Sequence, residues 1–246
     1  HLRNYTRWQL VQTRRVPEAL GITAQQHYWT HNGGSPYEVM LVNGSPHKHG
    51  CTDRALEEVA AELGRQNIDA EIFWIGAKPA AGCMACGRCR QTGACIFDDA
   101  VNEFRALAVD ADAFVFGAPV HYAHASGSLL SFMDRLFYSN GHAGAPDVLR
   151  FKPAAAVVSA RRGGTTASLD DIQKFFTISQ MPIVSSRYWN MVHGNTAEEV
   201  EQDLEGLWTM RQLARNMAWI LRSLEAGAPL DELPEQESPK PTNFIR

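Results

Sequence analysis

The 246-residue sequence lacks any apolar run near the ~20 residues that a membrane-spanning helix needs. It also lacks an excess of basic residues, because 23 Lys and Arg stand against 27 Asp and Glu, a formal net charge of −4. Nothing in this balance indicates a nucleic-acid or membrane-surface partner. A signal peptide with a charged start, an apolar core and a small-residue cleavage site is absent too. We therefore expect a cytoplasmic protein.

Cysteine is scarce, with five in the chain, and four of the five share one short polar loop, residues 82–95. Cys83, Cys86, Cys89 and Cys95 have the spacing C-x2-C-x2-C-x5-C. Thiolates this close in sequence can turn toward one point, as a soft metal centre requires. The nearest pattern is the compact ferredoxin run, which indicates a [4Fe–4S] cluster. Zinc, an empty site and structural or redox-active thiols are the alternatives, and the sparse cysteine usage argues against a secreted disulfide scaffold.

Three regions differ in composition. Residues 1–36 are rich in Arg, contain a single acid, Glu18, and end in the loop-like HNGGSP. We interpret them as an N-terminal extension of unassigned role: a helix packed on the domain, a partner arm or a processing remnant. Residues 37–227 form one regular domain, and the Pro-rich residues 228–246 form a C-terminal tail.

Short apolar runs alternate with helical periodicity through the domain. The runs bounded by turn residues predict buried strands at 39–42, 70–75, 113–116, 153–159 and 182–185. Apolar residues at helical spacing predict helices over 53–66, 98–109, 128–138 and 169–176. Thr196 and Glu199 form a capping-box pattern that begins a last helix, whose apolar stripe runs from Val200 through Leu204 to Leu224. This alternation predicts an α/β fold with a parallel sheet covered by helices on both faces.

Three unusual loops each follow a predicted strand, at 43–52, 117–127 and 159–166. In open parallel sheets, ligands bind outside the carboxyl ends of the strands, at the topological switch point. All three loops should therefore open onto the same edge of the sheet.

The first loop runs from Asn43 to Thr52 and leads into a helix. Its hydroxyls, its backbone N–H groups and the positive end of the helix dipole are suited to a phosphate group. An ordinary strand-to-helix turn with Thr52 as the N-cap is the alternative. Cys51 lies where a helix N-terminus could lower its pKa, but we interpret this thiol as incidental to the chemistry.

The second and third loops offer flat surfaces and positive charge. Pro119 restricts the backbone, and His121 and Tyr122 can lie against an aromatic ring system. His121 is also a candidate proton donor, although packing is the alternative role. Arg161 and Arg162 precede Gly163 and Gly164, so fixed charge accompanies a backbone that a ligand can approach closely. Such charge would favour a reduced flavin, and the alternative is two solvated arginines in a glycine turn.

Residues 37–246 resemble the iron–sulfur flavoprotein branch of the NADPH-dependent FMN reductase family, within the flavodoxin-like superfamily. The segments that carry the resemblance are GSPHKHGCT, the cysteine loop, APVHYAHASGSLLSFMDR, SARRGGTT and MPIVSSRYWNMVHGNT. The resemblance implies a flavodoxin-like, doubly wound, five-stranded parallel sheet in the order 2-1-3-4-5, with FMN at the strand ends. It also implies a homodimer or a tetramer, with the cysteine loop and flavin sites near subunit contacts.

The same resemblance implies the residues that hold each group. The FMN phosphate would be held by Ser45, Pro46, His47, Gly50, Cys51 and Thr52. The isoalloxazine ring would be lined by Pro119, Val120, His121 and Tyr122, and its pyrimidine edge approached by Ser159, Arg161, Arg162, Gly163 and Gly164. The cluster would be ligated by Cys83, Cys86, Cys89 and Cys95.

Two positions depart from the pattern of the family. Gly50-Cys51-Thr52 stands where Gly-Asn-Thr is more usual, which could weaken one contact to the phosphate. His121 stands where an aromatic residue, often Tyr, is common, which leaves room for an altered substrate or proton path. His121 and Arg161 are the candidate catalytic residues.

The function implied is that of an FMN-dependent oxidoreductase. It would pass electrons from NAD(P)H or a reduced ferredoxin-like carrier to a quinone, an oxygen species or a nitro compound. A [4Fe–4S] cluster would relay single electrons. The alternatives are an NAD(P)H-dependent FMN or quinone reductase without a cluster, a non-enzymatic electron carrier or redox sensor, and a dehydrogenase dedicated to one metabolite.

Overall fold

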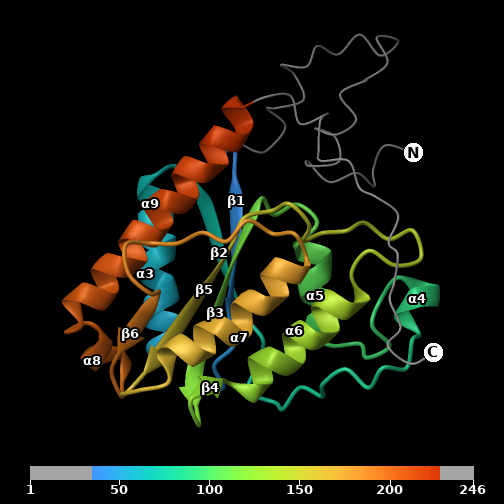
Figure 1. Ribbon diagram of the computed structural model, residues 1–246, viewed down its shortest axis with the longest axis horizontal. Helices are drawn as coiled ribbons and strands as arrows, with labels where there is room; N and C mark the ends of the chain where they lie inside the picture. Colours follow the sequence, from blue (N-terminus) through green and yellow to red (C-terminus); the bar gives the residue numbers. More distant parts are fainter. Residues whose placement is uncertain (1–34, 228–246) are drawn as a thin grey trace, which may run out of the picture.

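The computed structural model describes residues 35–227 (Figure 1). The predictions for the C-terminal tail, 228–246, and for the N-terminal extension up to residue 34 lie outside the described residues.

A parallel sheet forms the centre of the molecule, in the order β2-β1-β3-β5-β6. The five strands are β1 (Glu38–Asn43), β2 (Asp69–Trp74), β3 (Ala113–His121), β5 (Ala154–Ala160) and β6 (Met191–His193). A two-residue strand, β4 (His124–Ala125), pairs antiparallel with the end of β3. Along the parallel strands this is the predicted order 2-1-3-4-5, so the prediction of fold class is confirmed.

The strand sequences follow from their positions in the sheet. The inner strand β5, AAAVVSA, is buried at every residue, and the first six residues of β3 are buried as well. Continuous apolar runs are typical of parallel strands covered on both faces. The edge strand β2, DAEIFW, has one buried residue, Phe73, because only one of its sides is paired.

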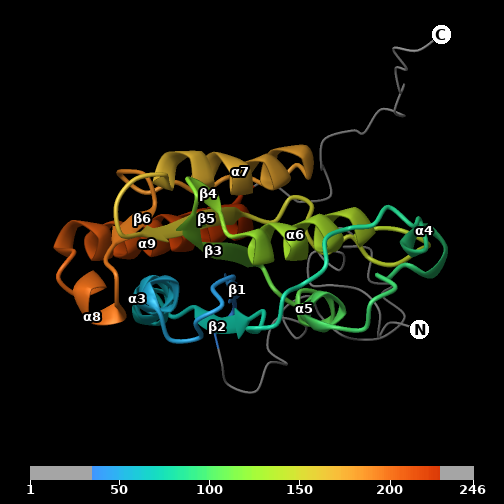
Figure 2. The same ribbon diagram turned by 90° about the horizontal axis from the view of Figure 1, so that it is seen from below.

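Helices cover both faces of the sheet, as Figures 1 and 2 show. One face carries α3 (Cys51–Arg65) and α9 (Leu204–Ala226), which pack on an aliphatic core. The other face carries α5 (Ala100–Leu107), α6 (Gly127–Ser139) and α7 (Thr165–Ile178), whose core is rich in phenylalanine. Two short helices are α4 (Cys89–Thr92) and α8 (Ala197–Val200). Within residues 35–227, no helix has the length and apolarity needed to cross a bilayer.

The predicted fifth strand, 182–185, is wrong. Only Ile183 pairs with the sheet there, in an isolated bridge to Ala154. The strand is instead β6, in the register Val158 to Met191. Pro182 has no N–H to give to a ladder, and within 182–185 only Val184 is buried, so the segment does not continue as a strand of the sheet.

Two further boundaries differ from prediction. β3 continues past residue 116 to His121, because Pro119 still pairs with Ser159 of β5. The capping pattern at Thr196 begins α8 alone, and Asp203 caps the separate helix α9 by accepting from the Gly206 N–H. Leu204 follows this break and is 74% exposed, so its predicted place in the buried stripe is wrong.

Candidate functional site

The three loops predicted to converge do meet at the carboxyl edge of the sheet, the edge that bears β4 in Figure 1. The Gly44 N–H donates to the Gly117 carbonyl at 2.8 Å, which joins the loops after β1 and β3. The Ser126 hydroxyl donates to the Gly44 carbonyl at 3.0 Å. Thr52 Oγ1 and Ser159 Oγ lie 2.8 Å apart, which joins the start of α3 to the end of β5. We call residues 43–52, 117–127 and 159–166 the rim.

Glycine is required where the rim loops approach most closely. A Cβ atom on Gly44 would lie 2.6 Å from Leu129 Cβ and 2.8 Å from the Gly117 carbonyl oxygen. A Cβ atom on Gly117 would lie 2.9 Å from Thr52 Cγ2. Both positions are too close for any side chain, so glycine sets the spacing between β1, β3 and the helices above them.

The loop after β1 is closed by Asn43, which sequence reasoning did not single out. Its amide nitrogen donates to the Lys48 carbonyl at 3.0 Å and to Asp53 Oδ1 at 2.9 Å. Its Oδ1 accepts from the Ser45 N–H at 3.0 Å. The Ser45 hydroxyl accepts from the His47 N–H at 3.1 Å, which leaves its own proton available to a ligand. Asn directly after a buried strand, before Gly and Ser, was the available signal.

Helix α3 begins with an open N-terminus. Its N-cap is Gly50, with no side-chain cap among the described residues, so the alternative of Thr52 as the N-cap is wrong. Thr52 is buried inside the first turn and shares its hydroxyl with Ser159. The N–H groups of such a first turn carry partial positive charge and are suited to an anion. Burial raises the pKa of the Cys51 thiol, which outweighs the lowering expected at a helix N-terminus.

The loop after β3 is a hairpin rather than an irregular segment. Tyr122 and Ala123 form its two-residue turn with φ of +51° and +64°, positive at both positions as in a type I′ turn. Gly164 has φ of +98°, and a Cβ atom there would lie 2.7 Å from Ala123 Cα. The hairpin therefore packs against the backbone of the loop after β5. Tyr122 is fully exposed at its tip, and His121 is exposed beside it.

Arg161 and Arg162 lie at the same edge of the sheet. Pro119 of β3 pairs with Ser159 of β5, so the ends of these two strands are adjacent, and Arg161 directly follows β5. Both guanidinium groups are exposed, and within residues 35–227 neither makes an ion pair. The structure thus brings the predicted rim residues together, and their roles toward a ligand remain predictions.

The four cysteines of the loop 82–95 line one common pocket, together with Met84, Ile96, Phe97, and Arg135, Tyr138 and Ser139 of α6. All four are free thiols: Cys89 is buried, Cys95 is half-buried, and Cys83 and Cys86 are exposed. Among the described residues, no three His, Cys, Asp or Glu side chains lie together as they would around a single metal ion. Four thiols around one pocket fit a multi-iron cluster, in which each thiolate binds a different iron. We call this feature the cysteine pocket.

Backbone turns in the left-handed region bring the cysteines around this pocket. Ala85 has φ of +53° and Gly87 has φ of +69°, on either side of Cys86. Gly93 has φ of +73° and ends α4 by donating its N–H to the Cys89 carbonyl at 2.8 Å. Each such residue reverses the chain locally, so that thiols separated by two or five residues can face the same point.

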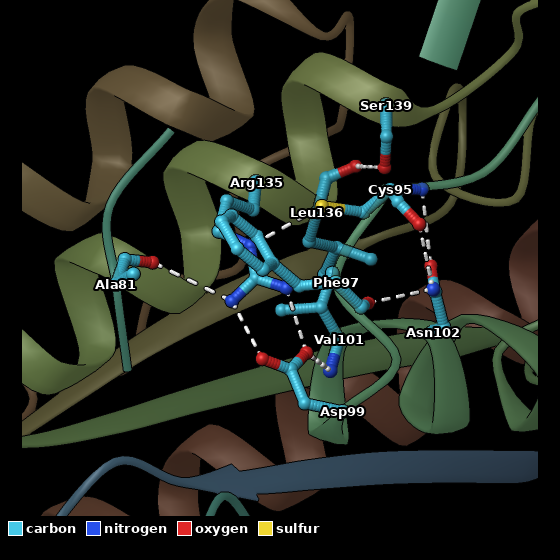
Figure 3. Close-up of polar contacts among 9 residues, drawn as sticks. All are labelled: Ala81, Cys95, Phe97, Asp99, Val101, Asn102, Arg135, Leu136 and Ser139. Atoms are coloured by element: carbon cyan, nitrogen blue, oxygen red, sulfur yellow. Dashed lines mark hydrogen bonds and ion pairs between the residues drawn. The ribbon is translucent and has the colours of Figure 1, made fainter. Parts of the chain in front are cut away.

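A polar network beneath the pocket was missed by sequence reasoning (Figure 3). Arg135, on α6, is 1% exposed and makes a two-armed ion pair with Asp99, at 2.8 Å and 2.7 Å. Its Nε donates to Cys95 Sγ at 3.3 Å, and its guanidinium lies 4.8 Å from the centre of the Phe97 ring. The available signal was a charged residue among the buried positions of a predicted apolar helix face.

The same network fixes the backbone of Cys95. Asn102 Oδ1 accepts from the Cys95 N–H at 3.1 Å, and Asn102 Nδ2 donates to the carbonyls of Cys95 and Phe97, both at 2.9 Å. The hydrogen bond from Arg135 is the main cause that lowers the pKa of Asp99, and the same contact raises the pKa of Arg135. Both groups are therefore charged across the ordinary pH range.

Known proteins resemble this chain in sequence and in fold. An iron-sulfur flavoprotein of Methanocaldococcus jannaschii is 26% identical over 199 residues, which are 76% of this chain and 99% of that protein. An iron-sulfur flavoprotein of Methanosarcina thermophila is 27% identical over 191 residues, 75% of this chain and 95% of that protein. The solved structure of RosB with a bound formylriboflavin phosphate intermediate has a TM-score of 0.62 at 10% identity, over 85% of this chain and 94% of that chain, and shares the fold.

The match to a family model is the most direct of these findings. The model for the NADPH-dependent FMN reductase family matches residues 37–196, which contain every rim loop and the cysteine pocket. That span covers more than half of the 246 residues. The protein is therefore a member of the NADPH-dependent FMN reductase family, a family of oxidoreductases.

Proposed function

We propose that this protein binds FMN at the rim and passes electrons from NAD(P)H or a reduced ferredoxin-like carrier to a small acceptor such as a quinone. The observation that carries this proposal is the meeting of three strand-end loops, joined by the contacts Gly44 to Gly117, Ser126 to Gly44, and Thr52 to Ser159. Ligands of doubly wound sheets occupy this position.

The loop after β1 would hold the phosphate of FMN. The open first turn of α3 supplies N–H groups, and the Ser45 hydroxyl still has a proton to donate. Thr52 acts differently from the expectation of a direct ligand, because its hydroxyl is shared with Ser159. Its side chain would hold the loops together, while its backbone N–H belongs to the phosphate cradle.

The hairpin and the loop after β5 would hold the ring system. Residues 119–122 present one flat side, and Arg161 and Arg162 supply positive charge on the neighbouring strand end. Bound FMN supplies hydride acceptance and can divide an electron pair into single electrons. Arg161 would stabilise negative charge on the reduced ring, and His121 is the proposed proton donor.

We further propose that the cysteine pocket holds a [4Fe–4S] cluster, ligated by Cys83, Cys86, Cys89 and Cys95. Its support is the common pocket of four free thiols and the printed names of two relatives that are 26% and 27% identical. Such a cluster supplies one-electron transfer between an external carrier and a flavin.

One purification tests both parts of the proposal. Protein prepared without oxygen should show flavin absorption bands on a broad iron–sulfur background, with about four iron and about four sulfide per chain. Colourless protein that fails to take up added FMN would contradict the FMN proposal. Flavin bands without iron would leave a reductase without a cluster. NAD(P)H-dependent reduction of a quinone separates an enzyme from an electron carrier.

We also propose that the chain assembles as a homodimer or tetramer. Its support is the exposure of large apolar side chains, among them Trp189, 56% exposed, and Trp219, 69% exposed. Isolated exposed apolar residues are normal, but aromatic residues are enriched at protein–protein interfaces. Sedimentation velocity should show a species larger than 27.3 kDa, and a sharp monomer peak at micromolar concentration would contradict the assembly.

A further inference from the structure

Arg135 is an unfavourable residue to bury at its position. Its side chain is among the largest that the protein buries, at 1% exposure, and its buried neighbours on the helix include Phe132, Met133 and Leu136. Burying a guanidinium costs free energy unless every charge and donor is matched, and an apolar residue of similar volume is often at least as stabilising. Stability alone therefore does not explain an arginine here.

The donors of Arg135 are divided between two partners. The terminal nitrogens Nη1 and Nη2 both go to the Asp99 carboxylate, at 2.8 Å and 2.7 Å, and Nη1 also reaches the Ala81 carbonyl at 3.4 Å. This two-armed pair fixes the plane of the guanidinium. The remaining donor, Nε, then points at Cys95 Sγ, 3.3 Å away (Figure 3).

The opposite sides of Cys95 and Arg135 are fixed as well. Asn102 holds the Cys95 N–H and carbonyl, so the backbone that carries the sulfur is fixed beside Arg135. The Phe97 ring covers the guanidinium, which reduces the access of water to this hydrogen bond. The carboxylate of Asp99 cancels the positive charge of Arg135 at longer range. The main influence of Arg135 on the Cys95 sulfur is therefore the short hydrogen bond from Nε.

A hydrogen bond to a ligating sulfur stabilises the form of an iron–sulfur cluster that carries more negative charge, and it raises the reduction potential. We propose that Arg135 is a positioning residue that raises the reduction potential of the cluster and retains its iron, through the Nε hydrogen bond to Cys95 Sγ. This inference rests on the cluster that the proposed function places in the cysteine pocket. It adds a residue outside the C-x2-C-x2-C-x5-C motif to that site.

The test uses full-length protein purified without oxygen, with iron and sulfide measured before any comparison. Arg135→Met removes the charge and the donor. Arg135→Lys keeps a charge that can pair with Asp99 but has no separate nitrogen at the position of Nε, which faces the sulfur. Arg90→Gln is the matched control, because Arg90 is exposed, follows Cys89 directly and stacks on Tyr138 instead of bonding a sulfur. Each protein is titrated with dithionite, which supplies one electron to each cluster, and is followed by electron paramagnetic resonance.

Both Arg135 variants should have a lower cluster midpoint potential than the wild type and should lose iron to a chelator about 10-fold faster or more, as second-layer variants of metal sites commonly do. Arg90→Gln should match the wild type in both measurements. The potential is the deciding readout, because a purely structural arginine would change iron loss without moving it. Arg135→Lys keeps the test decisive if Arg135→Met does not fold.

Three results would overturn the inference, and they are distinguishable. If the wild-type protein contains no iron and sulfide, the proposed cluster is absent and the inference about Arg135 fails with it. A cluster whose potential is unchanged in the Arg135 variants would leave the proposed function standing and reject the role of Arg135. An equal shift in Arg90→Gln would show a general effect of charge and would also reject the hydrogen bond as its cause.

Discussion

The rim and the cysteine pocket are built in different ways. The rim stands on the ends of buried parallel strands, and backbone groups and hydroxyls join its loops, as between Gly44 and Gly117. The cysteine pocket is formed where one irregular, largely exposed loop lies against α6. Arg135 of α6 bonds Cys95 of this loop and pairs with Asp99 just beyond it.

The difference shows which part of each site is sensitive to substitution. In the rim, most positions are set by strand geometry, so the sensitive residues are the glycines that allow close approach. In the cysteine pocket, little regular structure sets the loop, so its shape depends on a few side-chain contacts. We therefore expect the rim to be most sensitive to substitution of its glycines, and the cysteine pocket to substitution of the side chains that contact its loop.

The largest expected loss of stability follows from breaking the ion pair between Arg135 and Asp99, beside the cysteine pocket. Asp99→Ala leaves the buried guanidinium of Arg135 without its counter-ion and removes the N-cap of α5, where the Asp99 side chain accepts from the Val101 N–H. Because the Asp99 side chain is 41% exposed, we expect a loss of about 3 kcal/mol, less than for a fully buried pair plus a cap. Urea unfolding measures it.

Asp99→Asn is the control that separates the two contributions, because asparagine still caps a helix. It should cost about 1 kcal/mol less than Asp99→Ala. Asp98→Ala, which removes the exposed neighbouring acid, should leave stability unchanged. Equal losses from Asp98→Ala and Asp99→Ala would show that the pocket is held by general charge.

The next effect tests the rim. Gly164→Ala forces a side chain into a left-handed position, φ +98°, and places Cβ 2.7 Å from Ala123 Cα, so the hairpin must move. We expect a loss of stability of about 1–3 kcal/mol and weaker FMN binding. Gly163→Ala is the matched control for stability, since a Cβ atom there meets nothing within 4 Å. If both variants unfold at the wild-type temperature, the close approach of hairpin and loop is wrong.

A smaller effect appears in acid. The pKa of Asp99 is lowered from 3.8, chiefly by the hydrogen bond from Arg135, so the folded state holds the ionised form more strongly than the unfolded state does. That contribution is fully present above pH 3.8 and is lost as the pH falls through the lower folded value. The stability difference between the wild type and Asp99→Asn should therefore narrow below pH 3.8. A difference independent of pH would contradict the ion pair.

The smallest effect concerns the two rim arginines. Replacing both Arg161 and Arg162 with Ala should make bound FMN harder to reduce, because positive charge near the ring favours its reduced form. Both side chains are exposed, so solvent and salt screen them, and we expect a change of the two-electron midpoint potential of about 20 mV. A spectroelectrochemical titration measures it, and an unchanged potential removes both residues from this role.

The rim could be predicted from the sequence because it depends on regular features of parallel sheets. Apolar runs such as Val39 to Val42 identify buried strands, and parallel strands place their following loops at one edge. The fifth strand was missed because Met191–His193 is three residues long, too short to show a hydrophobic pattern. The apolar run at 182–185 was mistaken for the strand instead.

Only part of the cysteine pocket could be predicted from the sequence. The spacing of its cysteines predicts a ligand set, since ligands in one loop are close in sequence. The partner of Arg135 lies 36 residues earlier in the chain, and no local pattern links the two residues. The open start of α3 was likewise hidden, because Thr52 satisfies the sequence rule for an N-cap but is turned toward Ser159.

Helix α6 touches both sites. Ser126 at its first end caps the helix and bonds the Gly44 carbonyl of the rim, and Arg135 bears on the cysteine pocket. Nine residues of α-helix span about 14 Å along the axis. Helix α6 therefore links the two proposed redox sites, and its length, rather than the loops at either end, would set the distance over which an electron travels.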